Sequence, residues 1–103
     1  MFAKFFSKSK DTNNKLLKKV DNMALYHYGG CPYCFRVRIA MTKLNLDIPM
    51  NDILKSQSHR KELKSGGGST TVPCLRIEEE GKIRWMYESE DIVEYLEREF
   101  GKS

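Results

Sequence analysis

The sequence predicts a single α/β domain, and three observations support this fold class. A chain of 103 residues has the length of one domain and can form a hydrophobic core without disulfides. Its periodicity predicts the order strand, helix, strand, helix, strand, strand, helix. The first strand-helix-strand unit predicts a parallel pair with a right-handed crossover, and the last two strands predict an antiparallel hairpin.

The first strand is predicted over residues 24–28, an apolar and aromatic run that ends at a pair of glycines. A largely apolar helix is expected to begin at Pro32, because the missing N–H of proline costs nothing in the first turn. This helix is predicted to end near Asn45. The first half of the chain therefore supplies the strand and helix of a β-α-β unit.

Residues 46–53 predict the second strand, with an edge position or a break near its proline. A short polar helix should follow, capped by Ser56 or Ser58. We expect this helix to stop at glycines 66–68 and give way to a flexible loop there. No G-K-[ST] follows these glycines, so a phosphate-binding loop is not supported.

Residues 71–88 predict two strands joined by a turn at the glutamate run. Residues 89–101 predict the clearest helix of the chain, with Ser89 as the N-cap and Gly101 as the C-cap. Its buried stripe is predicted to consist of apolar residues at helical spacing, namely Ile92, Val93, Tyr95, Leu96 and Phe100.

The N-terminal leader, residues 1–22, differs in charge from the domain predicted over 23–103. Residues 1–20 hold six lysines and one acidic residue, a net charge of +5, whereas the remainder carries −1. A near-neutral body lacks the basic stripe typical of nucleic-acid binding, so we expect no nucleic-acid partner. Residues 12–23 predict an extra helix packed on the domain. The alternative is weak contact of residues 1–20 with an anionic membrane surface.

The cysteines and the hydropathy pattern bear on the compartment. No apolar run approaches the roughly 18 residues of a membrane span, and no secretory signal is evident. Cys31, Cys34 and Cys74 are an odd number, which argues against a fully paired secreted framework. We expect Cys74 to be a small buried hydrophobe. We expect a cytoplasmic monomer, peripheral to the inner face of a membrane if the leader contacts lipid.

Cys31 and Cys34 form a C-x-x-C pair at the predicted start of the first helix. At an N-cap, Cys31 would face unpaired N–H groups and the positive helix end, which favour the attacking thiolate. Cys34 lies one turn deeper and could resolve a mixed disulfide. Zinc usually needs a second ligand pair, which His27, His59 and Cys74 do not supply at suitable spacing, so we expect no metal. The motif alone leaves redox catalysis, zinc and a structural disulfide open.

Three motifs together resemble the glutaredoxins: "CPYC" at a helix start, "TVPCL" about 40 residues later, and "YESEDIVEYL" in the last helix. The resemblance covers residues 24–101. It implies a thioredoxin-like fold with a four-stranded mixed sheet, helices on both faces and a cis peptide bond before Pro73. It also implies a glutathione-dependent thiol–disulfide oxidoreductase that acts on glutathionylated or disulfide-containing proteins, with Cys31 and Cys34 as the catalytic residues.

The resemblance further implies where the co-substrate glutathione binds. The backbone of Val72 would lie beside Cys31 and pair with the cysteinyl part of the tripeptide. Glu88 and Ser89 resemble the Glu-Ser pair in the N-terminal domain of glutathione transferases, which holds the γ-glutamyl end. The predicted glutathione-binding residues are Tyr33, Thr71, Val72, Pro73, Glu88 and Ser89.

Two features depart from the glutaredoxin pattern: the Glu-Ser pair at the start of the last helix, where typical glutaredoxins have G-G followed by polar residues, and position 28. Tyr28 stands where many glutaredoxins carry a lysine, three residues before the first cysteine. The missing cation could come from Arg36, from Arg38, or from Arg60 and Lys61. Two other functions stay open: glutathione conjugation, which the Glu-Ser pair suggests, and a glutathione-binding adaptor that carries an iron–sulfur cluster or is tethered to a membrane.

Overall fold

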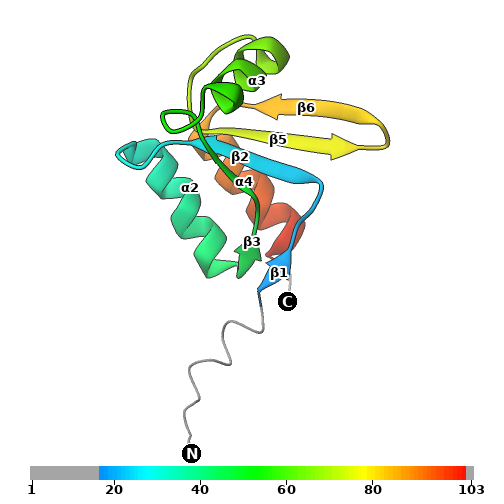
Figure 1. Cartoon of the computed structure of the whole chain (residues 1–103). Coiled ribbons are helices and arrows are strands. Elements are labelled where there is room, and N and C mark those ends of the chain that lie inside the picture. Colours follow the sequence, from blue (N-terminus) through cyan, green and yellow to red (C-terminus); the bar gives the residue numbers. More distant parts are fainter. Residues whose placement is uncertain (1–16, 102–103) are drawn as a thin grey trace, which may run out of the picture.

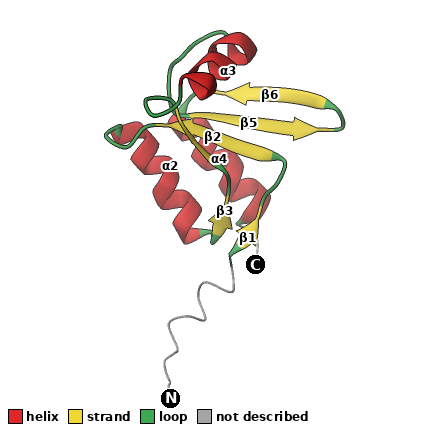
Figure 2. Ribbon diagram, viewed as in Figure 1, coloured by secondary structure: helices red, strands yellow, loops and turns green. Residues whose placement is uncertain are grey.

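The computed structural model describes residues 17–101. These residues form a mixed four-stranded sheet in the order β4-β2-β5-β6, and β1 pairs separately with β3. Helices α2 and α4 lie on one face of the sheet and α3 lies on the other (Figures 1 and 2). The elements are β1 (Lys18–Lys19), β2 (Met23–His27), α2 (Pro32–Lys43), β3 (Leu46–Asp47), β4 (Met50–Asp52), α3 (Gln57–Gly67), β5 (Cys74–Glu79), β6 (Lys82–Met86) and α4 (Ser89–Phe100).

The strand pairings confirm the α/β thioredoxin-like topology. Strand β2 pairs parallel with β4 and antiparallel with β5, and β5 forms an antiparallel hairpin with β6. The hairpin turn has positive φ at both central residues, 52° at Glu80 and 79° at Gly81. This geometry matches the two-residue turns whose twist suits a hairpin.

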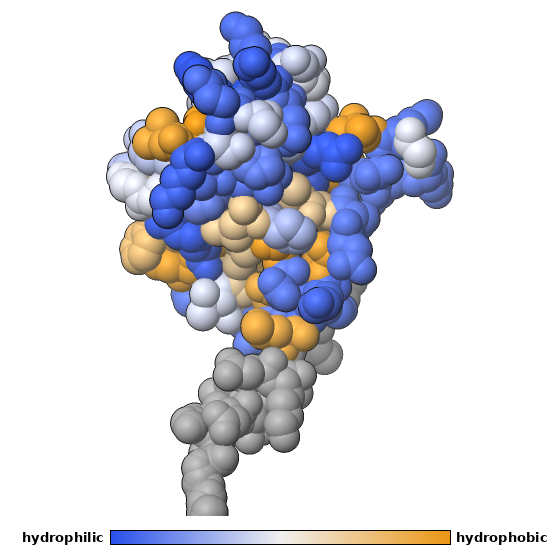
Figure 3. Space-filling view, viewed as in Figure 1, coloured by the Kyte–Doolittle hydropathy of each residue, from blue (hydrophilic) through white to orange (hydrophobic). Residues whose placement is uncertain are grey.

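The strands separate two hydrophobic clusters because successive side chains point to opposite faces of a sheet. Leu25 and Leu75 belong to the cluster under α2 and α4, whereas their neighbours Tyr26 and Cys74 belong to the cluster under α3. The surface in Figure 3 is largely hydrophilic, with small hydrophobic patches set apart from one another. Burial on both faces of the sheet therefore provides the core that holds the site residues.

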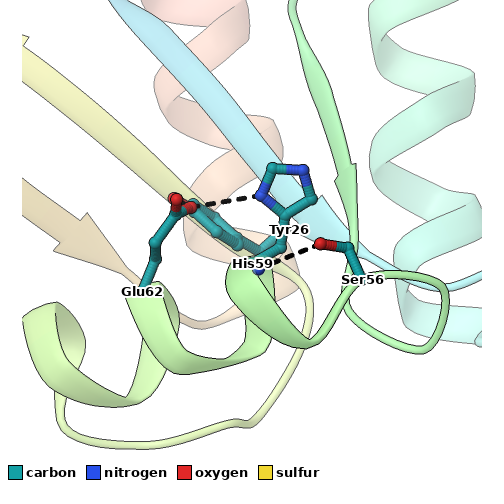
Figure 4. Close-up of polar contacts among 4 residues, drawn as sticks. All are labelled: Tyr26, Ser56, His59 and Glu62. Carbon is teal, nitrogen blue, oxygen red and sulfur yellow. Dashed lines mark hydrogen bonds and ion pairs between the residues drawn. The ribbon is translucent and has the colours of Figure 1, made fainter.

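Helix α3 is attached to β2 by a polar cluster (Figure 4). The hydroxyl of Tyr26 donates to Glu62 Oε1 at 3.0 Å, and His59 Nδ1 lies 3.2 Å from the same oxygen. The N–H of His59 donates to the Ser56 hydroxyl at 3.3 Å, so Ser56 is the N-cap of α3. These contacts fix α3 over the sheet from its first two turns.

The helix predicted over residues 12–23 is wrong in the part that the structure describes, and residues 12–16 lie outside that part. Residues 18 and 19 form β1, which pairs parallel with β3. The N–H of Lys18 donates to the Asn45 carbonyl at 2.7 Å, and the N–H of Val20 donates to the Asp47 carbonyl at 3.0 Å. Pairing of this backbone and burial of Val20 in the core outweigh a weak local helix preference.

The strand predicted over residues 46–53 is interrupted at Pro49, as expected. Proline has no N–H to donate, but its carbonyl accepts from the N–H of Leu25 at 2.8 Å. The chain divides into β3 and β4, which join two different sheets. The predicted edge position is also confirmed, because β4 is an outer strand of the four-stranded sheet.

Helix α3 ends within the glycine run, as predicted, but Gly66 and Gly67 are still helical, so the expectation that the whole run forms a loop is wrong. Gly66 and Gly67 lie so close to the β6 hairpin region that a Cβ atom would overlap the rings of Trp85 and Tyr87, respectively. Gly68 then ends the helix with φ of 93°. The glycines therefore permit close helix–sheet packing, and the flexible loop expected there is replaced by the last turn of α3.

The start of α4 differs from the prediction by one position. Glu88 is the N-cap, without a capping side-chain hydrogen bond, and Ser89 is the first helical residue. Gly101 is the C-cap, as predicted. The predicted stripe is confirmed, since all five of its residues pack in or against the same core cluster, namely Ile92, Val93, Tyr95, Leu96 and Phe100.

Candidate functional site

The C-x-x-C pair lies at the N-terminal end of α2. Cys31 is the N-cap, with extended backbone angles of φ −84° and ψ 118°, which confirms the predicted position. The N–H of Cys34 donates to Cys31 Sγ at 3.3 Å. Because Pro32 occupies the first helical turn, the helix begins at the residue after the nucleophile candidate. The sulfur of Cys31 thus accepts from a helix-start amide that would otherwise be unpaired.

Both cysteines of the pair are buried, but Cys31 keeps 4% of its surface exposed whereas Cys34 has none. Burial raises the pKa of the Cys34 thiol to about 12, and the hydrogen bond with Cys31 acts in the same direction. Cys34 therefore stays protonated near neutral pH. This supports the expected division of work, in which the more deeply buried thiol does not make the first attack.

The loop before β5 lies against this helix start. The peptide bond between Val72 and Pro73 is cis, as the resemblance implied. The thiol of Cys31 points to the carbonyl of Val72 at 4.0 Å, which is the outer limit for a sulfur hydrogen bond. The backbone of Val72 therefore lies beside the sulfur.

One cleft of about 430 Å³ collects all six residues predicted to bind glutathione. Three chain segments meet there: the first two turns of α2, the loop before β5 and the segment that leads into α4. They contribute two, three and four residues to the lining, which consists of Tyr33, Arg36, Thr71, Val72, Pro73, Tyr87, Glu88, Ser89 and Glu90. Residues that lie far apart in the sequence thus form one concave site.

The α4 end of the cleft can accept an anion. Ser89 is only 8% exposed, and the described residues supply no hydrogen-bond partner to its hydroxyl. The first intrahelical bond of α4 runs from the Ile92 N–H to the Glu88 carbonyl, so earlier amides have no helical partner. A carboxylate placed here would receive these amides and the positive end of the helix dipole.

Tyr33 forms the opposite wall. Its side chain is 59% exposed, although it is aromatic and lies directly between the two cysteines. This exposure argues against a packing role and leaves the ring free to flank a bound molecule. Its place in the cleft agrees with the predicted contact to the tripeptide.

Of the cations considered for the missing lysine, the structure brings one into the cleft. Arg36 lines it, whereas Arg38 donates to the Gly29 carbonyl at 3.4 Å on another side of the helix start. Arg60 and Lys61, from α3, are not among the cleft residues. Arg36 is therefore the candidate cation of the site.

The sequence did not predict two of the residues that line the cleft, Tyr87 and Glu90. The hydroxyl of Tyr87 donates to the Ser69 carbonyl at 2.9 Å and accepts from the Ser69 N–H at 3.3 Å. It thereby holds the segment that leads into the Val72 loop. The signal was present in the sequence, since these two residues flank Glu88 and Ser89 in "YESE".

A second hollow lies beside the cleft, between α2 and α4. Its volume is about 490 Å³, and it shares Arg36 and Glu90 with the cleft. Cys74 is fully buried on the α3 side, and burial raises its pKa to about 12.

Within residues 17–101, no group of three or more His, Cys, Asp or Glu side chains could hold a metal ion. Over the same residues, no helix is long and apolar enough to cross a membrane.

Comparison with solved structures shows the same fold. A maleylacetoacetate isomerase from Anaeromyxobacter dehalogenans 2CP-1, solved with GSH bound in its active site, has a TM-score of 0.61 at 23% identity. The match covers 79% of this chain and 38% of that protein. The trimeric glutathione transferase TDR1 of Leishmania has a TM-score of 0.65 at 26% identity, covering 82% of this chain and 18% of that one.

Sequence comparison gives the family. Glutaredoxin 2 of Escherichia coli (strain K12) is 31% identical over 80 residues, which cover 78% of this chain and 35% of that protein. The chain thus spans about a third of the length of this curated relative. The family model described as "Glutathione S-transferase, N-terminal domain" matches residues 25–103. The chain therefore belongs to the family of glutathione S-transferase N-terminal domains.

Proposed function

We propose that this domain is a glutathione-dependent thiol–disulfide oxidoreductase of the dithiol glutaredoxin type. The observation that carries the proposal is the contact of 3.3 Å between the Cys34 N–H and Cys31 Sγ at the start of α2. An amide and the positive helix end both stabilise a negative sulfur at this position. The similarity to Glutaredoxin 2 supports the same chemistry.

The proposed reaction consists of two thiol–disulfide exchanges. The Cys31 thiolate attacks the glutathionyl sulfur of a mixed disulfide, and the substrate sulfur leaves as a thiolate that takes up a proton. A disulfide now joins Cys31 to glutathione. The thiolate of a second glutathione attacks the glutathione sulfur, forms glutathione disulfide and releases the Cys31 thiolate. The cycle thus consumes one free glutathione, and the glutathionyl group taken from the substrate leaves as the other half of glutathione disulfide.

Cys34 offers a second route for the same intermediate. After losing its proton, its sulfur can attack Cys31 Sγ and release glutathione, which leaves an intramolecular disulfide. Two further glutathione molecules then reduce this disulfide. Burial holds the pKa of Cys34 high, so this route needs the Cys34 thiol to lose its proton first, whereas the route through a second glutathione does not.

In the proposed complex, the glutathionyl residue lies along the cleft. Its cysteinyl backbone pairs with Val72 in the manner of an added strand, next to Cys31. Its γ-glutamyl carboxylate meets the buried Ser89 hydroxyl and the free amides of α4, and Glu88 lies near enough to pair with the ammonium group. Glutathione bound in the active site of a protein with the same fold supports this placement.

Reduction of a glutathionylated peptide tests the proposal. Cys31→Ser should abolish turnover, whereas Cys34→Ser should keep much of it, because only Cys31 is needed for the route through two glutathiones. In the Cys34→Ser variant, Cys31 should form a disulfide with glutathione. This adduct, detected by intact mass, should account for the retained activity. Full turnover by Cys31→Ser would rule out the mechanism.

Glutathione conjugation is the second candidate, because the family match is to transferase N-terminal domains. The same cleft could hold glutathione for attack on an electrophile. A chlorinated aromatic acceptor separates the two functions: thiol–disulfide exchange predicts no conjugate above the uncatalysed rate. A conjugate whose formation depends on Ser89 would favour the transferase function.

We also propose a setting for the reaction. The odd cysteine count and the free dithiol suit a reducing compartment, and we place the protein in the cytoplasm as a monomer. The six lysines and the phenylalanines of residues 1–20 suit weak contact with an anionic membrane surface. Flotation with phosphatidylserine-containing liposomes, with and without residues 1–20, tests this contact. Equal behaviour of both forms would remove it.

A further inference from the structure

An ion pair lies between the cleft and the hollow beside it. Arg36 of α2 and Glu90 of α4 approach to 3.9 Å, and both residues line both spaces. Their side chains are 58% and 85% exposed. Exposed pairs at this distance are weak because water and salt screen them. The pair can therefore exchange its partner without disturbing the core.

The charges of the cleft do not match those of glutathione while this pair is closed. Among the described residues that line the cleft, Arg36 is the one cation, and Glu88 and Glu90 are the acidic residues. Glutathione brings two carboxylates and one ammonium group. An incoming carboxylate at the α4 end would approach Glu90, a like charge, while the nearest guanidinium is engaged with that same Glu90.

We propose that Arg36 is the glutathione-binding cation of this site and that Glu90 is its counter-ion only while the cleft is empty. The inference rests on the proposed function and names a specificity residue for it. The γ-glutamyl carboxylate replaces the Glu90 carboxylate on the guanidinium, which can hold both oxygens of the ligand group.

The local structure favours this exchange at the α4 end of the cleft. The ligand carboxylate that pairs with Arg36 also accepts hydrogen bonds from the free amides of the first α4 turn and from the hydroxyl of Ser89. That hydroxyl is buried and has no partner among the described residues. Glu90 belongs to that same turn but is exposed, so its carboxylate can return to water at little cost. The two residues therefore act in opposite directions, because Arg36 attracts the ligand and Glu90 competes with it.

Calorimetric titration of the reduced protein tests the exchange. The probes are S-methylglutathione, which cannot react, and its analogue with γ-aminobutyrate in place of the γ-glutamyl residue, which lacks only the α-carboxylate. Arg36→Ala should weaken binding of S-methylglutathione by about tenfold or more, as loss of a charge-assisted pair predicts. The same variant should change binding of the analogue by less than about twofold. Arg36→Lys should recover part of the loss.

Glu90→Gln should change the affinity for S-methylglutathione in the opposite direction. Removal of the competing carboxylate should tighten binding of S-methylglutathione by about twofold to fivefold, the scale of an exposed ion pair. Lys43→Ala is the matched control, since Lys43 is an exposed cation of α2 that lines only the neighbouring hollow. This control should bind both probes as the wild type does.

Three results would overturn the exchange. The first is an equal loss of affinity for both probes in Arg36→Ala, which would place Arg36 on another part of the ligand. The second is weaker binding in Glu90→Gln, which would make Glu90 a ligand for the ammonium group. The third is unchanged binding of S-methylglutathione by Arg36→Ala. If the wild type binds S-methylglutathione and Arg36→Ala binds it equally well, only this inference fails. If the wild type does not bind it, the proposed function fails as well.

Discussion

The backbone N–H of Cys34 donates to the sulfur of Cys31 at 3.3 Å, while the Cys34 thiol itself is fully buried. The amide of Cys34 thus contacts the Cys31 sulfur, whereas the Cys34 side chain is enclosed by the protein. The amide stabilises negative charge on Cys31, and burial keeps the proton on Cys34. The C-x-x-C pair is therefore asymmetric before any substrate binds.

Selective alkylation should reveal this asymmetry. Burial raises the pKa of Cys34 and of Cys74 to about 12, so both thiols stay protonated at pH 8. Iodoacetamide at pH 8 should therefore modify Cys31 first, by more than about tenfold in rate. Peptide mapping by mass spectrometry after short exposure measures the order of modification.

The unfolded protein is the control for this experiment. In denaturant the three thiols lose their different environments and should react at similar rates. Modification of Cys34 ahead of Cys31 in the folded protein would contradict the asymmetry. The rates of Cys34 and Cys74 should also rise with pH up to about 12, because their thiolate populations increase over that range.

Cys74 should be dispensable for the reaction. It lies on the α3 side of the sheet, fully buried with Tyr26, Ile53 and Leu63. We expect Cys74→Ala to lower the free energy of unfolding by about 1 kcal/mol through lost packing and to keep the rate of peptide deglutathionylation. Urea denaturation and the turnover assay together measure this. A loss of turnover in a folded Cys74→Ala protein would show that the third thiol takes part in the chemistry.

The sequence was sufficient to predict most of the site because its signals are local. A proline after Cys31 marks the helix start, and the T-V-P motif marks the loop with the cis peptide bond. The Glu-Ser pair marks the start of α4, although the N-cap is Glu88 and not Ser89. All six predicted glutathione-binding residues consequently line one cleft.

Features that depend on distant contacts could not be predicted in this way. Residues 18–19 become a strand because β3 supplies their backbone partners, and nothing near them in the sequence indicates this. Gly66 is required at its place because a side chain there would overlap the ring of Trp85, which is 19 positions away. The choice of Arg36 over Arg38 depends on which face of α2 meets α4. Each case is a tertiary contact that overrides a local preference.

Gly66 should resist substitution by alanine even though alanine is the better helix former. A Cβ at this position would overlap the Trp85 ring. Overpacking of this kind costs about 1–3 kcal/mol, which exceeds the gain of about 1 kcal/mol in helix propensity. We therefore expect Gly66→Ala to lower the free energy of unfolding, as measured by urea denaturation.

A double-mutant cycle identifies the cause. In a Trp85→Ala background the overlap is absent, so Gly66→Ala should become neutral or stabilise by up to about 1 kcal/mol. Gly29→Ala is a control for the effect of a new methyl group, since its Cβ would meet no atom within 4 Å. An equal cost of Gly66→Ala in both backgrounds would place the cause in the helix backbone.

The polar cluster under α3 should make stability depend on pH in the acidic range. The hydrogen bond with His59 is the main cause that lowers the pKa of Glu62 below its ordinary value of 4.5, and the Tyr26 hydroxyl adds to it. The unfolded chain therefore binds a proton at this residue at a higher pH than the folded protein does. Stability from Glu62 is present above the ordinary pKa and is lost as pH falls through the folded-state pKa.

Comparison of wild type with Glu62→Gln isolates this contribution. Because half of the side chain of Glu62 is exposed, the difference in unfolding free energy at pH 6 should be modest, up to about 1 kcal/mol. It should shrink as the pH falls below 4.5, the ordinary pKa of the group, and the wild-type carboxylate takes up a proton. Tyr26→Phe should reduce the pH dependence in part, since it removes one donor and leaves His59 in place. An unchanged difference between pH 6 and pH 3, measured by urea denaturation, would mean that the charge of Glu62 does not stabilise the fold.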